Sequence, residues 1–486
     1  MNWLLFSEII YLIIAFLVCL RIIYDTQSTT KTLSYLLFAV FVPVIGICFY
    51  FFFGINYRNR KMYSKKLYEN DDMAKELKEH LRKYSDETFK NADSAVQSNK
   101  ELAYLVLNDS ASPLTSGNSV KLLVNGENKF PEVFHALQQA KNHIHIEYYI
   151  YEDDEIGTAI GDLMIQKARE GVKVRFIYDD FGSSSIRKKF VDRLKENGVE
   201  AFPFLKISFL LFANRINYRN HRKIIVIDGR TAFVGGINVC DKYINKNINA
   251  GRLFWRDTHV MICGPGVHYL QYLFLCDWNF CSEEKLTSED YFFPRRKDFP
   301  PHIDNKVVQI AASGPDSETP TILFSLLQAI NLATKEILIT TPYFIPGDSL
   351  LDALTIASLS GISVKILVPF KSDSLLVNSA AMSYYDDLLK AGVEIYQYTK
   401  GFVHAKTMVT DRKIAIVGTA NMDFRSFDLN FEVNAIVYDI AIANELADAF
   451  YEDIKDAHRI EEAVWEQRPV LKKIGQKAAR LLSPLL

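Results

Sequence analysis

Two short stretches of the sequence carry the same imidazole, ammonium and amide side chains at the same spacing. The first contains His221 and Lys223, and the second contains His404 and Lys406. In each copy an Asp lies seven residues after the His and an Asn lies seventeen residues after it; these are Asp228 and Asn238, then Asp411 and Asn421. A repeat of this kind, 183 residues apart, predicts a duplicated domain whose two copies supply equivalent groups to one site.

These residue types suit a phosphoryl group better than a metal ion. Lysine is cationic at neutral pH and has no lone pair to offer a metal, so we predict neither a metal nor a cofactor here. Lysine and asparagine instead donate hydrogen bonds to phosphate oxygens, and those from lysine are charge-assisted. Of two imidazoles, one can attack phosphorus while the other carries the proton of the leaving group. The pattern therefore predicts phosphoryl transfer.

Each motif leads into a run of β-branched residues, 224–227 in the first copy and 407–410 in the second, and such runs predict strands. Side chains alternate across a strand, so the His and Lys of each copy share one face. Asp228 and Asp411 follow at an odd spacing and fall on the other face. We therefore expect the four His and Lys side chains to face a common site, and the two Asp side chains to anchor strand ends.

The two stretches resemble the HKD motifs of the phospholipase D superfamily, and the whole chain is similar to the bacterial cardiolipin synthases within it. The matching residues are 215–223 at the first motif, 255–259 and 264–265 beyond it, and 421–426 after the second motif. The resemblance implies a catalytic set that includes Asp228 and Asp411. It also implies that Asn238, Asn421 and Thr419 hold the non-bridging oxygens of the phosphate.

The same resemblance implies that one acid orients the imidazole of its own motif, Asp257 in the first copy and Glu432 in the second. These acids lie 36 and 28 residues after the respective histidines, so the first copy carries an insertion. Arg215 and Arg219, just before the first motif, could hold a second anionic headgroup. The apolar and basic segment 205–219 around them fits either a lip that touches lipid or a buried strand and loop.

The reaction implied by the resemblance joins two molecules of phosphatidylglycerol. His221 would attack the phosphorus of one while His404 protonates the departing glycerol. His404 would then deprotonate a hydroxyl of the second lipid, so that the products are cardiolipin and glycerol. The symmetry of the motifs leaves open which histidine is the nucleophile.

Alternating strand and helix patterns precede the motif in each half of the chain and predict an α/β layer fold. Segments of the second half repeat the first, as residues 337–343 resemble 144–150 and 361–369 resemble 171–178. We expect two homologous phospholipase D-type α/β/α lobes about a pseudo-twofold axis, over 111–290 and 291–486, with the site between them. A basic, leucine-containing tail from residue 470 fits either an interfacial helix or a packed one.

The beginning of the chain has the composition of membrane helices. Residues 33–53 contain no charged side chain, and residues 3–20 contain only Glu8, so each run is long enough to span a hydrocarbon core. Residues 1–2 carry no basic side chain, which argues against a signal peptide. A basic cluster follows, made up of Arg58, Arg60, Lys61, Lys65 and Lys66.

By the positive-inside rule this cluster is cytoplasmic. We therefore predict a two-helix transmembrane hairpin over 1–57 and a basic connector with a helix over 58–110. The catalytic lobes would then lie on the cytoplasmic side of the bacterial inner membrane. Whether the basic residues only set the topology or also contact anionic headgroups stays open.

Composition limits the alternatives. The 486 residues have a formal net charge of −2. The chain therefore lacks the broad positive field that attracts nucleic acid, and we predict no nucleic-acid partner. The six cysteines form no CxxC pair, which indicates buried thiols in a reducing compartment. Three alternatives stay open beside the main reading: a phospholipase D or a transferase using another lipid such as phosphatidylethanolamine, a nuclease of the superfamily, and a non-enzymatic scaffold. The sequence does not indicate an oligomeric state.

Overall fold

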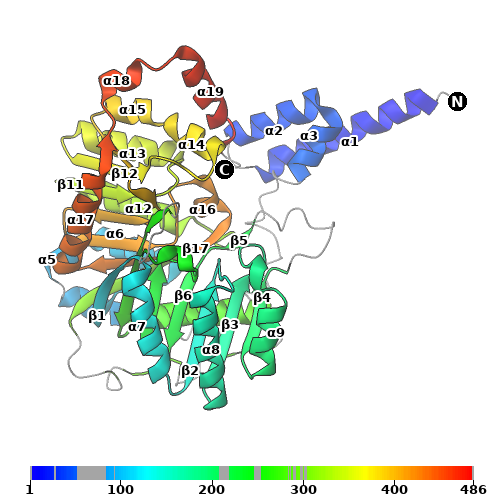
Figure 1. Ribbon diagram of the computed structural model, residues 1–486. Coiled ribbons are helices and arrows are strands. Elements are labelled where there is room, and N and C mark those ends of the chain that lie inside the picture. The colour runs from blue at the N-terminus through cyan, green and yellow to red at the C-terminus, as the bar shows by residue number, and fades with distance from the viewer. Residues whose placement is uncertain are drawn as a thin grey trace.

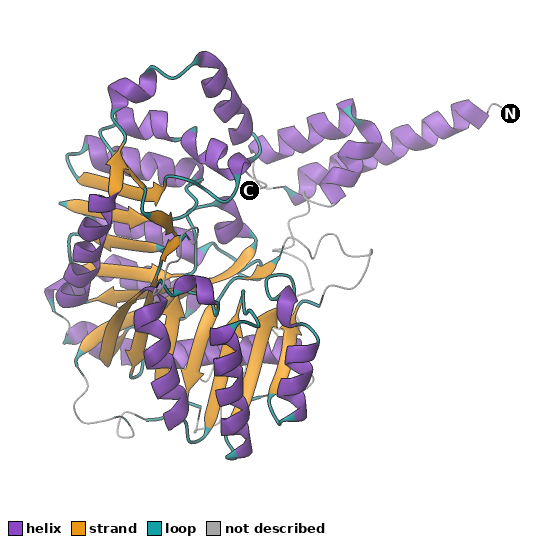
Figure 2. Ribbon diagram, in the orientation of Figure 1, coloured by secondary structure: helices purple, strands orange, loops and turns teal. Residues whose placement is uncertain are grey.

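The computed structural model describes residues 3–26, 29–51, 84–91, 93–206, 218–245, 253–282 and 304–483, together with 284, 286–287, 292–295 and 299. One large sheet runs through the molecule, with helices on both of its faces (Figures 1 and 2). The sheet is built from two halves in which the same strand order occurs twice.

In the first half the strand order is β1-β9-β7-β6-β2-β3-β4. The bounds are β1 (Thr115–Val124), β2 (His143–Tyr148), β3 (Lys173–Asp179), β4 (Glu200–Phe204), β6 (Lys223–Ile227), β7 (Thr231–Gly235) and β9 (Thr258–Cys263). Helices α7 (Asn125–Gln139), α8 (Glu155–Arg169) and α9 (Lys189–Glu196) cover one face of this half, and α11 (Val267–Cys281) covers the other.

In the second half the equivalent order is β10-β17-β16-β15-β11-β12-β13, extended by β18. The bounds are β10 (Lys306–Ser313), β11 (Glu336–Thr340), β12 (Ser363–Pro369), β13 (Glu394–Tyr398), β15 (Thr407–Thr410), β16 (Ile414–Gly418), β17 (Asn430–Tyr438) and β18 (Ala457–Arg459). The helices of this half are α12 (Thr321–Leu332), α13 (Gly347–Leu359), α14 (Leu375–Met382), α15 (Tyr385–Lys390), α16 (Phe424–Asp428), α17 (Ile440–Asp453), α18 (Glu462–Glu466) and α19 (Val470–Arg480).

The two halves join where β1 pairs with β10 in antiparallel orientation. Read outward from this pair, each half presents its strands in the same order, which confirms the predicted duplication of an α/β lobe. The predicted motif strands are also confirmed as β6 and β15. Helix α11 packs on the sheet in the first half and α17 packs on it in the second half. Residues of both helices belong to one apolar core, which therefore continues across the junction. Helices α5 (Ser94–Gln97) and α6 (Lys100–Ser110) precede β1, and α6 packs against β10 and α12.

Two short strands cross from one half to the other, and they position the site. β5 (Arg219–Asn220) belongs to the first half but pairs in parallel with β17. β14 (Gly401–Val403) belongs to the second half but pairs in parallel with β8 (Phe254–Arg256) of the first. Each crossing strand leads directly into a motif histidine, so each histidine is delivered to the seam between the halves.

The beginning of the chain is helical, but it is not a simple pair of helices. Helix α1 (Trp3–Asp25) covers the first predicted segment, whereas the second is divided into α2 (Thr29–Phe41) and α3 (Pro43–Phe49). The break follows from Pro43 at the start of α3, since proline has no backbone N–H for the preceding turn. Gly46 fits tightly at the bend, because a Cβ atom there would lie 2.1 Å from the carbonyl oxygen of Phe38. No helix in the described part of the chain has both the length and the apolar character that crossing a bilayer requires.

Candidate active site

Each motif histidine is bound by a carboxylate from the other half of the molecule. The Nδ1 atom of His221 lies 2.9 and 3.0 Å from the two carboxylate oxygens of Glu432. The Nδ1 atom of His404 lies 2.7 Å from Oδ2 of Asp257. The expectation that each acid serves the histidine of its own motif is therefore wrong, and the pairs are crossed.

The crossing strands explain this exchange. The backbone N–H of His221 donates to the carbonyl of Phe431 at 3.0 Å, and that of His404 donates to the carbonyl of Arg256 at 2.7 Å. Phe431 and Arg256 immediately precede Glu432 and Asp257 in the chain. The backbone pairing thus continues into a side-chain pairing, and the same arrangement occurs twice.

Glycines next to each motif let the opposing strand approach closely. A Cβ atom on Gly236 would lie 2.1 Å from Oδ1 of Asp257, and one on Gly418 would lie 1.9 Å from Oδ1 of Asn434. The small residues that follow each motif in the sequence are therefore needed where the acid-bearing strand packs against them.

The two motif lysines are buried beside the imidazoles. Nζ of Lys223 donates to the carbonyl oxygen of His221 at 2.8 Å, and Nζ of Lys406 lies 3.0 Å from Nδ1 of His404. Burial lowers the pKa of Lys223 to about 7 and that of Lys406 to about 8, and each ammonium group lowers the pKa of the histidines further. Two desolvated lysine side chains beside the imidazoles create a strong preference for an anion between the two motifs.

The imidazoles are neutral in this environment. Burial lowers the pKa of His221 to about 4, even though the carboxylate of Glu432 opposes the change. Burial, followed by the charges of Lys406 and Lys223, also brings the pKa of His404 well below its ordinary value. A neutral imidazole keeps the lone pair that a nucleophile needs, and in both histidines the Nδ1 atom is engaged, which leaves Nε2 for the substrate.

The two orienting acids differ in their own surroundings. Burial would raise the pKa of Glu432, but His221 and Lys223 bring it below its usual value. Burial raises the pKa of Asp257 to about 6, against the opposing charge of Lys406. The geometry of the site is therefore symmetric, while its electrostatics are not.

Thr419 supports Glu432 and does not point a free hydroxyl toward a phosphate. Its Oγ1 donates to Oε2 of Glu432 at 2.5 Å and accepts from the N–H of Val433 at 2.9 Å. The predicted phosphate contact of Thr419 is thus replaced by a positioning contact. Asn430 also donates to Glu432, at 3.2 Å.

The two motif asparagines have different partners. Nδ2 of Asn238 donates to the hydroxyl of Tyr243 at 2.9 Å, and that hydroxyl lies 3.4 Å from Nδ1 of His404. The Oδ1 atom of Asn421 is buried and has no hydrogen-bond partner in the described part of the chain. Asn421 therefore has a free hydrogen-bond acceptor at this oxygen, whereas Asn238 is already held in a network with Tyr243.

Asp228 and Asp411 are separate from the imidazoles, as their odd spacing indicates, so they do not belong with the catalytic set. The carboxylate of Asp228 accepts from the backbone N–H groups of Lys141, Asn142 and His143, at 2.7–2.9 Å. That of Asp411 accepts from residues 334–336 at 2.7–3.1 Å. Each aspartate anchors the beginning of the strand next to its motif strand, β2 or β11.

Aromatic rings enclose both histidines, and the sequence analysis did not identify them. The ring of Tyr149 lies edge-on to His221 with centroids 4.8 Å apart. Trp255 lies edge-on to His404 at 5.6 Å, and Phe402 lies at 5.9 Å. These rings restrict water and hold the imidazole planes. Trp255 and Phe402 belong to the crossing pair β8 and β14, so their position next to His404 depends on the tertiary fold.

Arg222, the residue between His221 and Lys223, makes a second contact that the sequence analysis missed. Its Nη1 lies 2.5 Å from Oδ2 of Asp277 on α11, and its Nε donates to the carbonyl of Glu432 at 3.4 Å. Both partners are buried. This ion pair ties the first motif to a helix and to the opposing strand. The second motif has Ala405 at the equivalent position.

Of the two arginines expected to meet a headgroup, Arg215 lies outside the described residues. Arg219 lies on β5, two residues before His221, and is buried. The basic cluster at 58–66 also lies outside the described residues.

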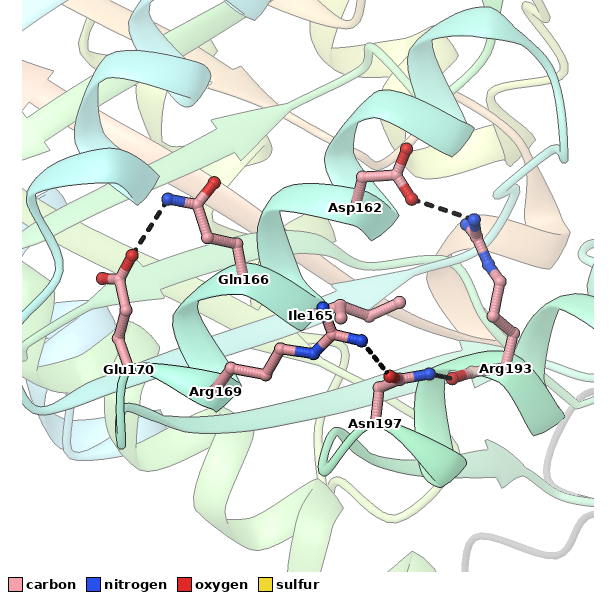
Figure 3. A pocket seen from close by; sticks show the side chains of 7 residues that line it. All are labelled: Asp162, Ile165, Gln166, Arg169, Glu170, Arg193 and Asn197. Atoms are coloured by element: carbon pink, nitrogen blue, oxygen red, sulfur yellow. Dashed lines mark hydrogen bonds and ion pairs between the residues drawn. The ribbon is translucent and has the colours of Figure 1, made fainter.

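Other polar groupings in the described part of the chain do not compete with this site. Glu152, Asp154 and Cys240 lie close enough to share a cation, but the carboxylate of Asp154 caps α8 through Gly157 and binds the N–H of Asp241. A surface hollow between α8 and α9 (Figure 3) is lined by side chains that pair with one another, such as Arg193 with Asp162. None of the motif residues lines that hollow.

Comparisons with known proteins agree with this geometry. The family described as "Cardiolipin synthase, PLD-like domain" matches residues 133–259 and 326–454, and the family described as "Phospholipase_D-nuclease N-terminal" matches residues 10–54. The chain is 42% identical to the major cardiolipin synthase ClsA of Bacillus subtilis, over 98% of both chains. It is 37% identical to a cardiolipin synthase of Listeria welshimeri, over 100% of both.

A solved structure shares the fold. Phosphatidylserine synthase of Haemophilus influenzae superimposes with a TM-score of 0.57 and 14% identity, over 79% of this chain and 100% of the other.

Proposed function

The chain belongs to the cardiolipin synthase family, and from this premise we propose that it joins two phosphatidylglycerol molecules into cardiolipin and releases glycerol. It is a phosphatidyltransferase of the phospholipase D superfamily. The observation that carries the detailed proposal is the pair of crossed contacts, His221 with Glu432 and His404 with Asp257, at the seam between the two halves.

In the first step the Nε2 atom of His221 attacks the phosphorus of one phosphatidylglycerol. The bond between phosphorus and the headgroup glycerol oxygen breaks, and that oxygen takes a proton from His404. A phosphatidyl-histidine remains on the enzyme and glycerol departs. Glu432 stabilises the positive charge that develops on the first imidazole.

In the second step a hydroxyl of another phosphatidylglycerol attacks the same phosphorus. Its proton passes to His404, the nitrogen–phosphorus bond breaks, and cardiolipin leaves. Each step forms one phosphorus bond and breaks one, so the proton count balances and no cofactor is consumed. The bond formed resembles the bond broken, which makes the overall reaction nearly isoenergetic and reversible.

Lys223 and Lys406 hold the non-bridging oxygens in this proposal, and the Nδ2 amide group of Asn421 is a further donor to them. The lysines are desolvated before substrate binds, so a phosphodiester anion restores the balance of charge. The added negative charge also favours protonation of His404, which the acid role requires. Asn238 contributes through Tyr243 on the His404 side.

For location, we propose that residues 1–57 form a transmembrane anchor that keeps the lobes 111–290 and 291–486 on the cytoplasmic side of the inner membrane, with 58–110 as the connector. Support comes from the apolar side chains that α1 and α2 expose, among them Leu12, Phe16 and Phe41. An anchor of this kind raises the concentration of the lipid alcohol relative to what a freely diffusing enzyme would meet.

Purified enzyme in phosphatidylglycerol vesicles tests the function. We expect cardiolipin and glycerol in equal amounts, and loss of both with His221→Ala and His404→Ala. A product that is mainly phosphatidic acid would identify a phospholipase D. Cardiolipin formed only when phosphatidylethanolamine is added would identify a different donor or acceptor.

A further inference from the structure

A buried cation lies next to the catalytic pair without a full set of partners. Arg219 is 4% exposed, and its Nη1 atom makes no hydrogen bond in the described part of the chain. Its guanidinium lies 4.6 Å from the centre of the Phe181 ring. A buried donor without an acceptor is costly, so Arg219 is a strong candidate to meet a ligand.

Asp179 is the acid whose charge acts most strongly on Arg219, but its carboxylate accepts hydrogen bonds from other groups. Asp179 accepts from the backbone N–H groups of Phe181 and Gly182, at 3.0 and 2.9 Å, and of Asn220 at 3.2 Å. Asp179 attracts the guanidinium group of Arg219 through its charge, but no ion pair or hydrogen bond joins the two side chains in the described part of the chain. Burial lowers the pKa of Arg219 although the charge of Asp179 opposes the change, and the positive charge of Arg425 in the second half lowers it further.

This region adjoins the proposed nucleophile. Tyr149, whose ring contacts His221 at 4.8 Å, is close enough to both Arg219 and Arg425 for their charges to act on its hydroxyl. Asn430 is the direct partner of Arg219 across β5 and β17, and its Oδ1 is also buried without a hydrogen bond in the described part of the chain. An unpaired donor and an unpaired acceptor thus come from residues that are paired across two adjacent strands.

We propose that Arg219 binds the phosphodiester of the acceptor lipid, while Asn430 accepts a hydrogen bond from its glycerol headgroup. This inference rests on the proposed function. The attacking hydroxyl of phosphatidylglycerol is joined to its own phosphate through the glycerol headgroup, so a cation beside His221 can hold that phosphate while the hydroxyl reaches the phosphatidyl-histidine. The motif lysines hold the phosphate under attack, and Arg219 holds the phosphate of the acceptor lipid.

A comparison of two acceptors tests this assignment. Free glycerol accepts the phosphatidyl group without carrying a phosphate, so exchange of radiolabelled glycerol into phosphatidylglycerol does not need the arginine site. For Arg219→Gln we expect kcat/KM for cardiolipin synthesis to fall about 10- to 100-fold. This is the change in rate that corresponds to the loss of one hydrogen bond to a charged group. Glycerol exchange falls far less, and Arg219→Lys gives an intermediate loss of synthesis.

Arg187→Gln is the matched control, because Arg187 forms an ion pair with Asp180, the residue before Phe181 in the chain, but is partly exposed. It is expected to change neither rate. Equal loss of synthesis and exchange in Arg219→Gln, with an unchanged melting temperature, would assign Arg219 to the donor site and overturn the proposal. Unchanged synthesis would overturn it as well. A wild-type enzyme that exchanges glycerol but makes no cardiolipin would instead contradict the proposed function.

A second and independent observation concerns α19, which packs with its polar side inward. Gln476 is buried and accepts from Arg468 at 2.7 Å, whereas Leu471 is 83% exposed and Leu481 is 81% exposed. Ile474 is exposed on the same face. A helix that buries glutamine and exposes leucine has its apolar face directed away from its own domain.

Helix α14, which packs against α19, extends this apolar face. Leu375 is 87% exposed and Leu376 is 43% exposed. Lys472 and Lys477 are exposed on α19 between the apolar positions. Apolar side chains mixed with lysines match an anionic bilayer surface, in which leucine enters the headgroup region and lysine meets lipid phosphate.

We infer that α14 and α19 form a second lipid contact of the catalytic part. The test places the photo-crosslinking residue p-benzoylphenylalanine at Leu471 of the full chain in vesicles containing radiolabelled phosphatidylglycerol, with the exposed Asp162 on α8 as the control position. Labelled lipid attached at 471 and absent at 162 supports the inference. Crosslinks between two copies of the chain, or no lipid adduct at 471, would overturn it.

Discussion

The crossed contacts predict which half-reaction fails when each acid is neutralised. Glu432→Gln leaves His221 without the carboxylate that lies 2.9 and 3.0 Å from its Nδ1. Removing one partner of a buried charged pair costs about 3–5 kcal/mol, which corresponds to a rate loss of about 150- to 5000-fold if the whole cost falls on the transition state. Asp257→Asn is expected to reduce the normal reaction to a similar extent through His404.

A substrate with an activated leaving group separates the two effects. Phosphatidyl-p-nitrophenol releases a phenolate that departs without a proton, so formation of the phosphatidyl-enzyme no longer needs a general acid. Rapid mixing and acid quench then measure the burst of nitrophenolate and the labelled protein. We expect Asp257→Asn and His404→Ala to recover most of the burst, and Glu432→Gln and His221→Ala to lack it.

The opposite pattern would refute the reasoning. If each acid served its own motif, Glu432→Gln would impair the proton donor and would be rescued by the activated substrate. Rescue of both acid variants would mean that neither acid acts on the nucleophile. Thr419→Val is a useful graded control, because it removes one hydrogen bond to Glu432 and leaves the carboxylate in place; a loss smaller than that of Glu432→Gln is expected.

Three further predictions follow from the same contacts. His221 has a pKa of about 4 in the folded protein, so the unfolded chain binds more protons than the folded one between that pH and about 6.5. The free energy of unfolding should therefore fall as pH decreases through this window. His221→Asn should lessen this fall by up to about 3 kcal/mol, measured by chemical denaturation. Asp228→Asn and Asp411→Asn should each lower stability by about 1–2 kcal/mol through the lost strand anchor but keep kcat per folded molecule, and a selective loss of kcat would return these residues to the catalytic set. Arg222→Met should destabilise by about 3–5 kcal/mol because Asp277 is left charged and buried, while Arg222→Met combined with Asp277→Leu should recover most of the loss in the same unfolding assay.

Local patterns in the sequence predicted the motif strands. They also predicted that Asp228 and Asp411, an odd number of residues after each histidine, lie on the opposite face of the strand from the histidine. Both features depend on side-chain alternation within one strand, so spacing alone was sufficient. The repeat of strand order also followed from the repeated motifs. The break between α2 and α3 was indicated by Pro43, yet the length of the apolar run favoured a single helix.

The crossed acids could not be read from spacing. Each acid lies 36 or 28 residues from the histidine of its own motif but 147 or 211 residues from the histidine that it actually contacts. Spacing therefore favours the wrong pairs, and the crossed pairs form because β5 and β14 leave their own half of the molecule. Strands of two or three residues have almost no sequence signal. The same limit hid the pair of Arg222 and Asp277, which are 55 residues apart in the chain, and the rings around His404.

The asymmetry between the two acids bears on the question that the symmetric motifs leave open. Attack by an imidazole on phosphorus produces a cationic phospho-imidazolium, which is best stabilised by a fully ionised carboxylate. Glu432, with a pKa below its usual value and with hydrogen bonds from Thr419 and Asn430, fits that requirement. Burial raises the pKa of Asp257 to about 6, so the carboxylate beside His404 is less fully ionised at neutral pH and is less suited to stabilise a lasting positive charge. We therefore infer that His221 is the nucleophile and His404 the proton carrier, because the environment of each acid matches the charge that its histidine must bear.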